Sequence, residues 1–136
     1  MTKDLYATAA ETAALLREGK RYRRERLQAA DMITVTEAAS LLNVDGSTMA
    51  TWIIGGRCIG LAGPDGTLRF PRWQFEPSVW SAIQLIGRAL GTQEPWLILG
   101  FLETPAPALE GLTPRVALER GTAVERVLAA AIDNAH

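Results

Sequence analysis

The chain has 136 residues and a net charge of −1 at pH 7, and its composition, 48% hydrophobic and 21% charged, is that of an ordinary folded protein of one domain or two very small ones. Cys58 and His136 are its only Cys and His residues, which excludes an intrachain disulfide and a zinc site built from such ligands, and no Gly-rich phosphate loop ends in Lys-Ser or Lys-Thr. The scarcity of such residues leads us to expect no metal, no cofactor and no enzymatic activity. No apolar run approaches the roughly 20 residues that span a bilayer, and the N-terminus lacks a signal-peptide pattern, so we expect a cytoplasmic protein that does not associate with a membrane.

The first predicted element is a helix within residues 1–30, over about residues 4–30. Ala and Leu dominate its first half and straight-chain Arg, Glu, Lys and Gln its second half, and all of these are good helix formers. Gly19 is expected to divide it into two pieces. Residues 17–26 contain six basic and two acidic side chains, a net charge of +4. Contact with the DNA backbone, dimerisation and a merely solvated helix face all remain open. The candidate DNA contacts in this helix are Arg21, Arg23 and Arg24.

Residues 31–76 are predicted to form a winged helix-turn-helix domain. Thr34 and Glu37 have the spacing of a capping box that begins a helix. A tight turn and a second short helix, through about Ile54, complete a helix-turn-helix pattern. Beyond two glycines, short apolar runs flank the turn sequence Pro64-Asp65-Gly66, which predicts a β-hairpin in the position of a wing.

The second helix of this pair is short enough to lie in the major groove of DNA. Its hydroxyl groups can bond base edges or phosphates, and arginines at its end and on the hairpin can reach phosphates. The candidate contacts are Ser47, Thr48, Thr51, Arg57 and Arg69. Met49 fits either core or contact, whereas Trp52 and Ile53 are expected in the core.

Charge argues against a monomer on DNA. Residues 31–76 hold three basic and five acidic side chains, a net charge of −2, and phosphate contacts supply most of the affinity for DNA. We therefore expect a homodimer that binds an inverted repeat of operator DNA with a steep salt dependence. A helix-turn-helix that contacts only protein is the open alternative.

Residues 77–136 are predicted to form a small helical domain with a net charge of −2. Pro77, Pro95 and Pro114 each occupy a position suited to a helix start, and the first of these helices is expected to run to about residue 90. Thr122 and Glu125 predict a second capping box before the last helix. The expected fold is therefore mainly α: an N-terminal helix, a helix-turn-helix with a small β-hairpin wing, and a C-terminal helical domain.

Two stretches resemble known families. The region from Ile33 to Phe75 resembles the winged helix-turn-helix of excisionase-like and MerR-like regulators, on Thr-Glu-Ala-Ala-Ser-Leu-Leu-Asn-Val, Ser-Thr-Met-Ala-Thr-Trp and Phe-Pro-Arg-Trp-Gln-Phe. The C-terminal region resembles the toxin-binding domain of Xre/MbcA/ParS-type antitoxins, on Trp96-Leu97, Leu-Glu-Gly-Leu-Thr-Pro at 109–114 and Val127-Leu128. That family is paired with RES-domain toxins. The resemblance implies a type II antitoxin that neutralises such a toxin and represses its own operon.

The toxin-binding residues expected from this resemblance are Trp96, Phe101, Arg115, Glu119, Arg126, Asn134 and His136. Trp96 fits a core position or an interface, because a small helical domain needs large apolar side chains of its own. A tail at residues 133–136 would act by occluding the partner's cleft. The alternative function is a prophage-type transcriptional regulator or DNA-architectural protein that uses its C-terminal domain for self-association, and an enzyme subunit is the reading with least support.

Overall fold

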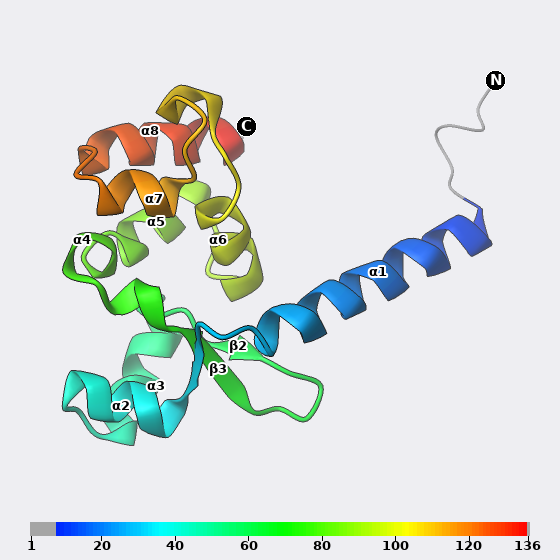
Figure 1. The fold of residues 1–136 in the computed structure, drawn as a ribbon, viewed down its shortest axis with the longest axis horizontal. Coiled ribbons are helices and arrows are strands. Elements are labelled where there is room, and N and C mark those ends of the chain that lie inside the picture. The colour runs from blue at the N-terminus through cyan, green and yellow to red at the C-terminus, as the bar shows by residue number, and fades with distance from the viewer. Residues whose placement is uncertain (1–7, 136) are drawn as a thin grey trace.

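In the computed structural model, which describes residues 8–135, one long helix projects from a body of two stacked parts (Figure 1). The projecting helix and the lower part comprise α1 (Ala9–Leu27), β1 (Met32–Thr34), α2 (Val35–Leu42), α3 (Gly46–Ile54), β2 (Leu61–Ala62), β3 (Leu68–Pro71) and the 3₁₀ turn η2 (Arg72–Phe75). The upper part comprises α4 (Pro77–Trp80), α5 (Ile83–Leu90), α6 (Pro95–Leu102), η3 (Pro107–Leu109), α7 (Pro114–Glu119) and α8 (Val124–Ala135). The mainly helical prediction is confirmed. No helix within residues 8–135 is long and apolar enough to cross a membrane.

Helix α1 begins with a capping box and runs unbroken to its end. Thr8 accepts a hydrogen bond from the backbone N–H of Glu11, and the Glu11 side chain accepts one from the N–H of Thr8. The predicted break at Gly19 is wrong, because flanking good helix formers outweigh the cost of about 1 kcal/mol that glycine brings to a helix interior. The predicted start at residues 4–7 lies outside the described residues. None of the α1 residues, all within the described part of the chain, is buried.

The sheet contains one strand that the sequence did not predict. Its order is β1-β3-β2 and both pairs are antiparallel, with Ile33 opposite Phe70 and Leu61 opposite Arg69. Strands β2 and β3 flank the predicted Pro-Asp-Gly turn. β3 is as long as the predicted run at 67–70, whereas β2 has only two residues and starts at the end of the run at 58–61. The extra strand β1 follows α1 in the chain and pairs with β3 on the side opposite β2 (Figure 1).

Helices α2 and α3 follow the predicted local signals. Thr34 and Glu37 form the capping box of α2, which ends at Asn43 in the left-handed conformation. Asp45 caps α3 by accepting a 2.7 Å hydrogen bond from the N–H of Thr48. Met49 is fully buried together with Ala38, Cys58 and Phe70, so it belongs to the core.

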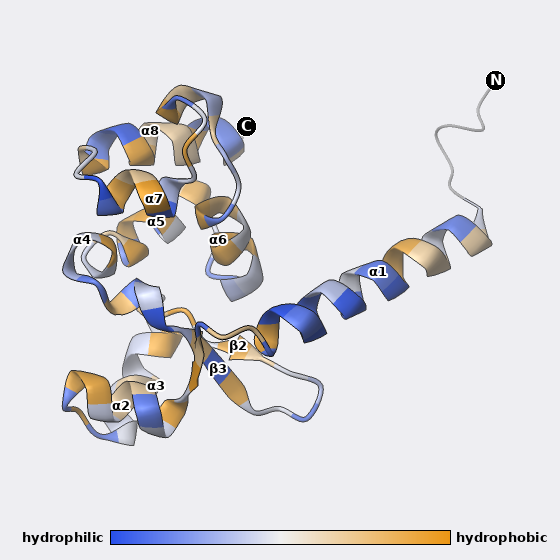
Figure 2. Cartoon of the chain, viewed as in Figure 1, coloured by the Kyte–Doolittle hydropathy of each residue, from blue (hydrophilic) through white to orange (hydrophobic). Residues whose placement is uncertain are grey.

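The main hydrophobic core extends across the predicted domain boundary at residue 76. Ile59, Leu61 and Trp73 from the lower part share one cluster with buried residues of α4–α8. Figure 2 shows hydrophobic residues on the ribbon of both parts near the place where they meet. The two parts therefore share the larger cluster, while the lower part also has a smaller cluster of its own around Met49 and Phe70.

Two predicted helix boundaries in the upper part are wrong. The helix expected from Pro77 to about residue 90 is interrupted between α4 and α5, where the Ser81 hydroxyl donates a hydrogen bond to the Pro77 carbonyl. The Thr122 capping box requires a helix start at 123, but α8 begins at Val124.

Gln74 replaces a missing strand partner at the junction of the two parts. Its side chain is fully buried, its Oε1 accepts a hydrogen bond from the N–H of Ile59, and its Nε2 donates one to the Ile59 carbonyl, both at 2.8 Å. This pair of bonds satisfies a buried backbone segment that is not part of any strand.

Replacing Gln74 with Leu is expected to lower the free energy of unfolding by about 3 kcal/mol, because two buried backbone groups of Ile59 lose their partners. Urea denaturation followed by circular dichroism measures this change. Gln84→Leu is the matched control, since Gln84 donates a single exposed bond to the Gly55 carbonyl and its loss should change stability far less. Equal losses in the two variants would contradict the role assigned to Gln74.

Candidate functional site

The outer face of α3 is the first candidate interface. Ser47, Ala50, Thr51 and Ile54 are exposed and follow the spacing of one helix face, and Ile54 is 77% exposed. The Thr51 hydroxyl donates to the Ser47 carbonyl at 3.1 Å, and Thr48 is half-buried beside the Asp45 cap. Backbone and side-chain hydrogen bonds from Thr48 lower the pKa of the Asp45 carboxyl. The face is thus a short strip of hydroxyl and apolar groups that the rest of the chain leaves uncovered.

Arg57 lies just beyond the end of α3 on an aromatic platform. Its guanidinium carbon is 4.9 Å from the ring centre of Trp52 and 5.3 Å from that of Trp80, and the two rings pack edge to face. Stacking of this kind orients the side chain while its donors stay available to solvent or an anion. Trp80 was not among the predicted site residues, and nothing in its local sequence links it to Arg57.

Two of the predicted DNA contacts converge between α1 and the hairpin. Arg24 and Arg69 line one cavity of about 350 Å³, together with the turn residue Asp65. The Asp65 carboxylate accepts hydrogen bonds from the hydroxyl and N–H of Thr67, at 2.7 and 3.1 Å, and the first of these is the main cause of its lowered pKa. We call this cavity the arm–hairpin groove. Two arginines that line one groove are suited to binding an anion such as a phosphate, and Arg69 also donates a 3.1 Å hydrogen bond to the Leu68 carbonyl.

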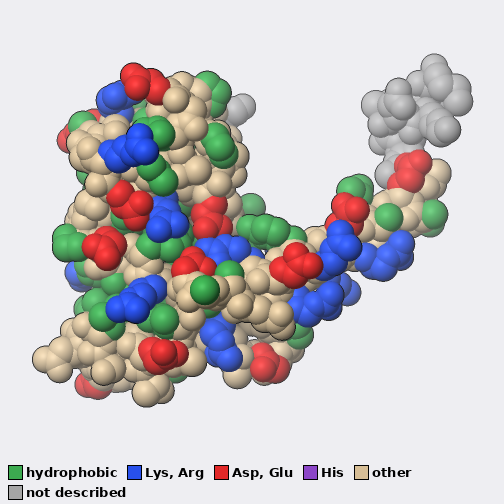
Figure 3. All heavy atoms as spheres, viewed as in Figure 1, with side chains coloured by type: hydrophobic (Ala, Val, Ile, Leu, Met, Phe, Trp, Pro, Cys, Tyr) green, Lys and Arg blue, Asp and Glu red, His purple; other side chains and the backbone are tan. Residues whose placement is uncertain are grey.

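The remaining basic residues of α1 divide between two faces. Arg21 and Arg24 share one side of the helix with Arg17 and Lys20. Figure 3 shows Lys and Arg side chains gathered along α1. Arg23 turns toward the body instead, with its guanidinium carbon 5.1 Å from the Trp96 ring centre. The first face, which also carries Glu18, is therefore exposed and net positive, and the second helps to anchor the helix.

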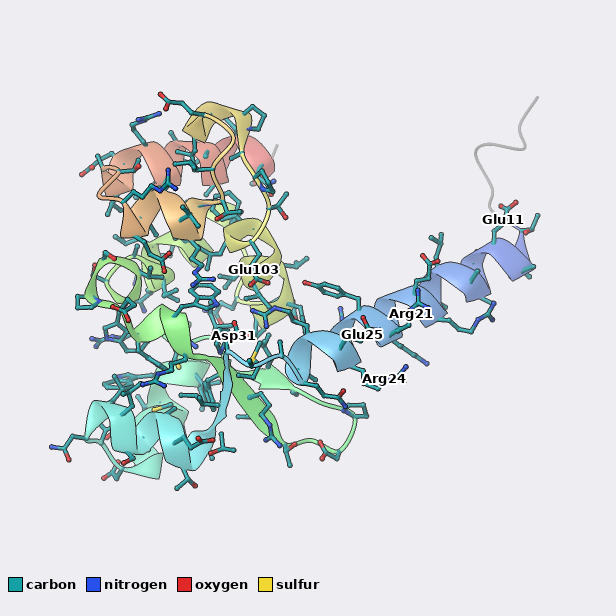
Figure 4. The ribbon with its side chains drawn as sticks, viewed as in Figure 1. Glu11, Arg21, Arg24, Glu25, Asp31 and Glu103 are labelled. Atoms are coloured by element: carbon teal, nitrogen blue, oxygen red, sulfur yellow. The ribbon has the colours of Figure 1, made fainter. Side chains whose placement is uncertain are left out.

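A cluster of charged residues fixes the base of α1. Arg26 donates two hydrogen bonds of 2.7 Å to Asp31, and two more, of 3.0 and 2.6 Å, to Glu103 at the end of α6. Trp73 adds a bond from its Nε1 to Asp31. The hydrogen bonds from Arg26 lower the pKa of Asp31, and those to both carboxylates raise the pKa of Arg26. Figure 4 places Asp31 and Glu103 where α1 meets the two parts of the body.

Three of the predicted toxin-binding residues border one groove of the upper part. Phe101, which is 7% exposed, and the exposed Asn134 line a cavity of about 340 Å³ with residues 104–108 and Asp133. Arg126 donates a 3.2 Å hydrogen bond to the Ala108 carbonyl and so ties the wall of this groove to α8. We call it the α6–α8 groove.

The other predicted toxin-binding residues lie elsewhere. Trp96 packs edge-on against Tyr22 of α1, with ring centres 6.4 Å apart. Arg115 pairs with Glu119 at 3.2 Å and lies 4.7 Å from the ring centre of Trp73. His136 lies outside the described residues. The structure therefore places the six of these residues that lie within 8–135 at more than one surface.

Arg26, Asp31 and Glu103 are the residues that sequence reasoning missed. Arg26 was counted as one charge within a basic run, and Asp31 as one acid of the following domain. Glu103 is 77 residues away from Arg26 along the chain, so no local spacing connects them.

Comparisons of the chain with models of protein families, with curated proteins and with solved structures find no match. The geometry of the three surfaces, together with the motifs in the sequence, is therefore the basis for a functional proposal.

The substitution Asp31→Asn is expected to lower the free energy of unfolding by about 1–2 kcal/mol near neutral pH, because Arg26 and Trp73 lose a partly exposed carboxylate partner. The pKa of Asp31 is lowered in the folded protein, so its contribution is complete above the ordinary value of 3.8 and is lost as the pH falls below it. Urea unfolding over a range of pH should show the difference from wild type shrinking in acid. A difference that stays constant, or one matched by Glu125→Gln on an exposed turn of α8, would contradict this assignment.

Proposed function

We propose that the chain is an antitoxin that binds operator DNA and also neutralises a RES-domain toxin. In this proposal α2 and α3 form a helix-turn-helix, the hairpin of β2 and β3 is its wing, and α4–α8 provide the toxin-binding surface. The observation that carries the DNA-binding half is the convergence of Arg24 and Arg69 on the arm–hairpin groove, beside a helix pair whose outer hydroxyl face is uncovered.

Helix α1 supplies the positive charge that the rest of the chain lacks. Residues 31–76 carry a net charge of −2, whereas residues 17–26 carry +4. Because cations that neutralise phosphates account for most affinity for DNA, the basic face of α1 would track the backbone while α3 lies in the major groove. Helix-turn-helix proteins place the second helix of the pair in that groove, which assigns base contacts to Ser47, Thr48 and Thr51.

Arg24→Ala and Arg69→Ala are each expected to weaken binding to specific and nonspecific DNA by a similar factor, and to reduce the slope of log affinity against log salt by about one. Fluorescence anisotropy with the promoter fragment upstream of this gene, over a salt series, measures both quantities. Arg120→Ala is the matched control, because Arg120 is an exposed arginine of the upper part.

Thr51→Val keeps the shape of the side chain and removes a hydroxyl from the outer face of α3. It should weaken specific binding by about tenfold and leave nonspecific binding nearly unchanged. Affinity that is insensitive to salt, or arginine variants that bind like wild type, would overturn the DNA-binding half and favour a helix-turn-helix that contacts only protein.

The toxin-binding half rests on the α6–α8 groove and on the resemblance of the C-terminal region to antitoxins. The groove joins an apolar floor at Phe101 to a polar rim at Asp133 and Asn134. Interfaces commonly combine a buried apolar centre with such a rim. Docking of a toxin here would hold the end of α8 against the partner, where the following residues could block its cleft.

Co-expression with the RES-domain product expected from the neighbouring gene is predicted to restore growth, and Asn134→Arg is expected to weaken that rescue by placing a bulky cation on the groove rim. Growth curves and co-purification measure the effect. Glu125→Arg serves as control, because it adds the same side chain at an exposed position near the other end of α8. Deleting residues 133–136 separates the mechanisms: retained rescue rejects occlusion by the tail but not neutralisation.

A transcriptional regulator or DNA-architectural protein without a toxin is the second candidate. The exposed side chains of Leu85, Leu97 and Ile132 on the upper part favour it, since apolar groups of this kind also suit self-association. A neighbouring gene that encodes no RES-domain protein, together with specific DNA binding, would support this candidate over the antitoxin.

A further inference from the structure

Helix α1 has two halves of different character. Residues 9–16 contain six apolar side chains and one charge, Glu11, whereas residues 17–26 carry a net charge of +4. Leu15 and Leu16 are 65% and 62% exposed in the apolar half. Figure 4 shows Glu11 near the far end of the helix and Arg24 near its base. The apolar half is thus the part most distant from the body.

The contacts that hold α1 to the body lie in its last two turns. Tyr22 and Arg23 meet Trp96, and Arg26 bonds Asp31 and Glu103. A 19-residue helix is about 28 Å long, and a helix with so little packing is only marginally stable in water. A partner on residues 9–16 would stabilise the helix and cover the two leucines.

We propose that this partner is α1 of a second copy of the chain, packed antiparallel so that residues 9–16 of each copy lie against residues 15–22 of the other. A parallel pair would set two segments of charge +4 side by side and two Glu11 side chains opposite each other. An antiparallel pair moves the basic halves to opposite ends. It also brings Glu11 of each copy level with Lys20 and Arg21 of the other while Leu15 and Leu16 meet near the twofold axis.

This dimer does not depend on the proposed function, although it would present two α3 helices to one DNA site. About four overlapping turns of two single helices bury less than the roughly 800 Å² per partner of a standard interface. The association is therefore reversible and concentration-dependent, with dissociation in the micromolar range or weaker.

Sedimentation equilibrium of the full chain over a range of concentrations tests the proposal. Wild type should show a monomer–dimer equilibrium, and the double variant Leu15→Glu with Leu16→Glu should weaken it by roughly tenfold or more. Glu matches Leu in helix propensity, so the helix itself is retained, and circular dichroism verifies this. Leu41→Glu is the control at an exposed leucine of α2, 47% exposed, and should dimerise like wild type.

Two further variants report the orientation. Glu11→Gln keeps the capping box but removes the charge, so it should weaken an antiparallel dimer by about threefold and would strengthen a parallel one. Leu16→Cys should form a cross-link between copies on oxidation, whereas Cys58 is buried, which raises its pKa to about 12 and keeps the native thiol unreactive.

A chain that stays monomeric at every concentration overturns the proposal. Three other results would also overturn it: a leucine double variant that self-associates like wild type, a tighter dimer with Glu11→Gln, or α1 variants that change only the binding of a toxin.

Discussion

The position of α1 depends on one arginine that binds two carboxylates at once. Arg26 makes paired hydrogen bonds to Asp31, just before β1, and to Glu103, at the end of α6. Paired bonds of this kind fix the plane of the guanidinium as well as its distance. Glu103 places a negative charge at the negative end of the α6 dipole. The positive charge of Arg26 compensates for the carboxylate and for the helix end. One side chain thus connects the projecting helix, the sheet and the upper helices.

This connection explains why residues from distant parts of the sequence lie together. Arg24 lies half a turn before Arg26, so the geometry that holds Arg26 also directs Arg24 toward Arg69 and the arm–hairpin groove. The core that Ile59, Leu61 and Trp73 share with α4–α8 joins the two parts on the other side of the same junction. A partner bound to the upper part would therefore act on a body that holds α1 in place, rather than on a separately tethered domain.

Local signals in the sequence predicted the elements well, and distant contacts were beyond their reach. Thr34 with Glu37, and the prolines at 77, 95 and 114, marked helix starts because capping and the missing N–H of proline act within one turn. Strand β1 was missed because three residues gain strand geometry only by pairing with β3, almost forty residues later. The placement of Arg24 and Arg69 at one groove, and the ion pair of Arg26 with Glu103, arise in the same way. Sequence reasoning named Arg24 and Arg69 as separate candidates and could not join them.

The distribution of charge shows why the direction of α1 matters for function. The regions 31–76 and 77–136 are each net negative, by two charges, and residues 17–26 are the one strongly positive segment between Thr8 and Ala135. If that segment moved freely, it would lose conformational entropy on binding an anionic partner. Its attraction to the partner would also favour no single orientation of α3. Held by Arg26 at one end, it presents its cations at a fixed position relative to the hairpin. In the proposed DNA-binding role, preorganisation rather than the amount of charge would therefore favour binding of this overall acidic chain to phosphates.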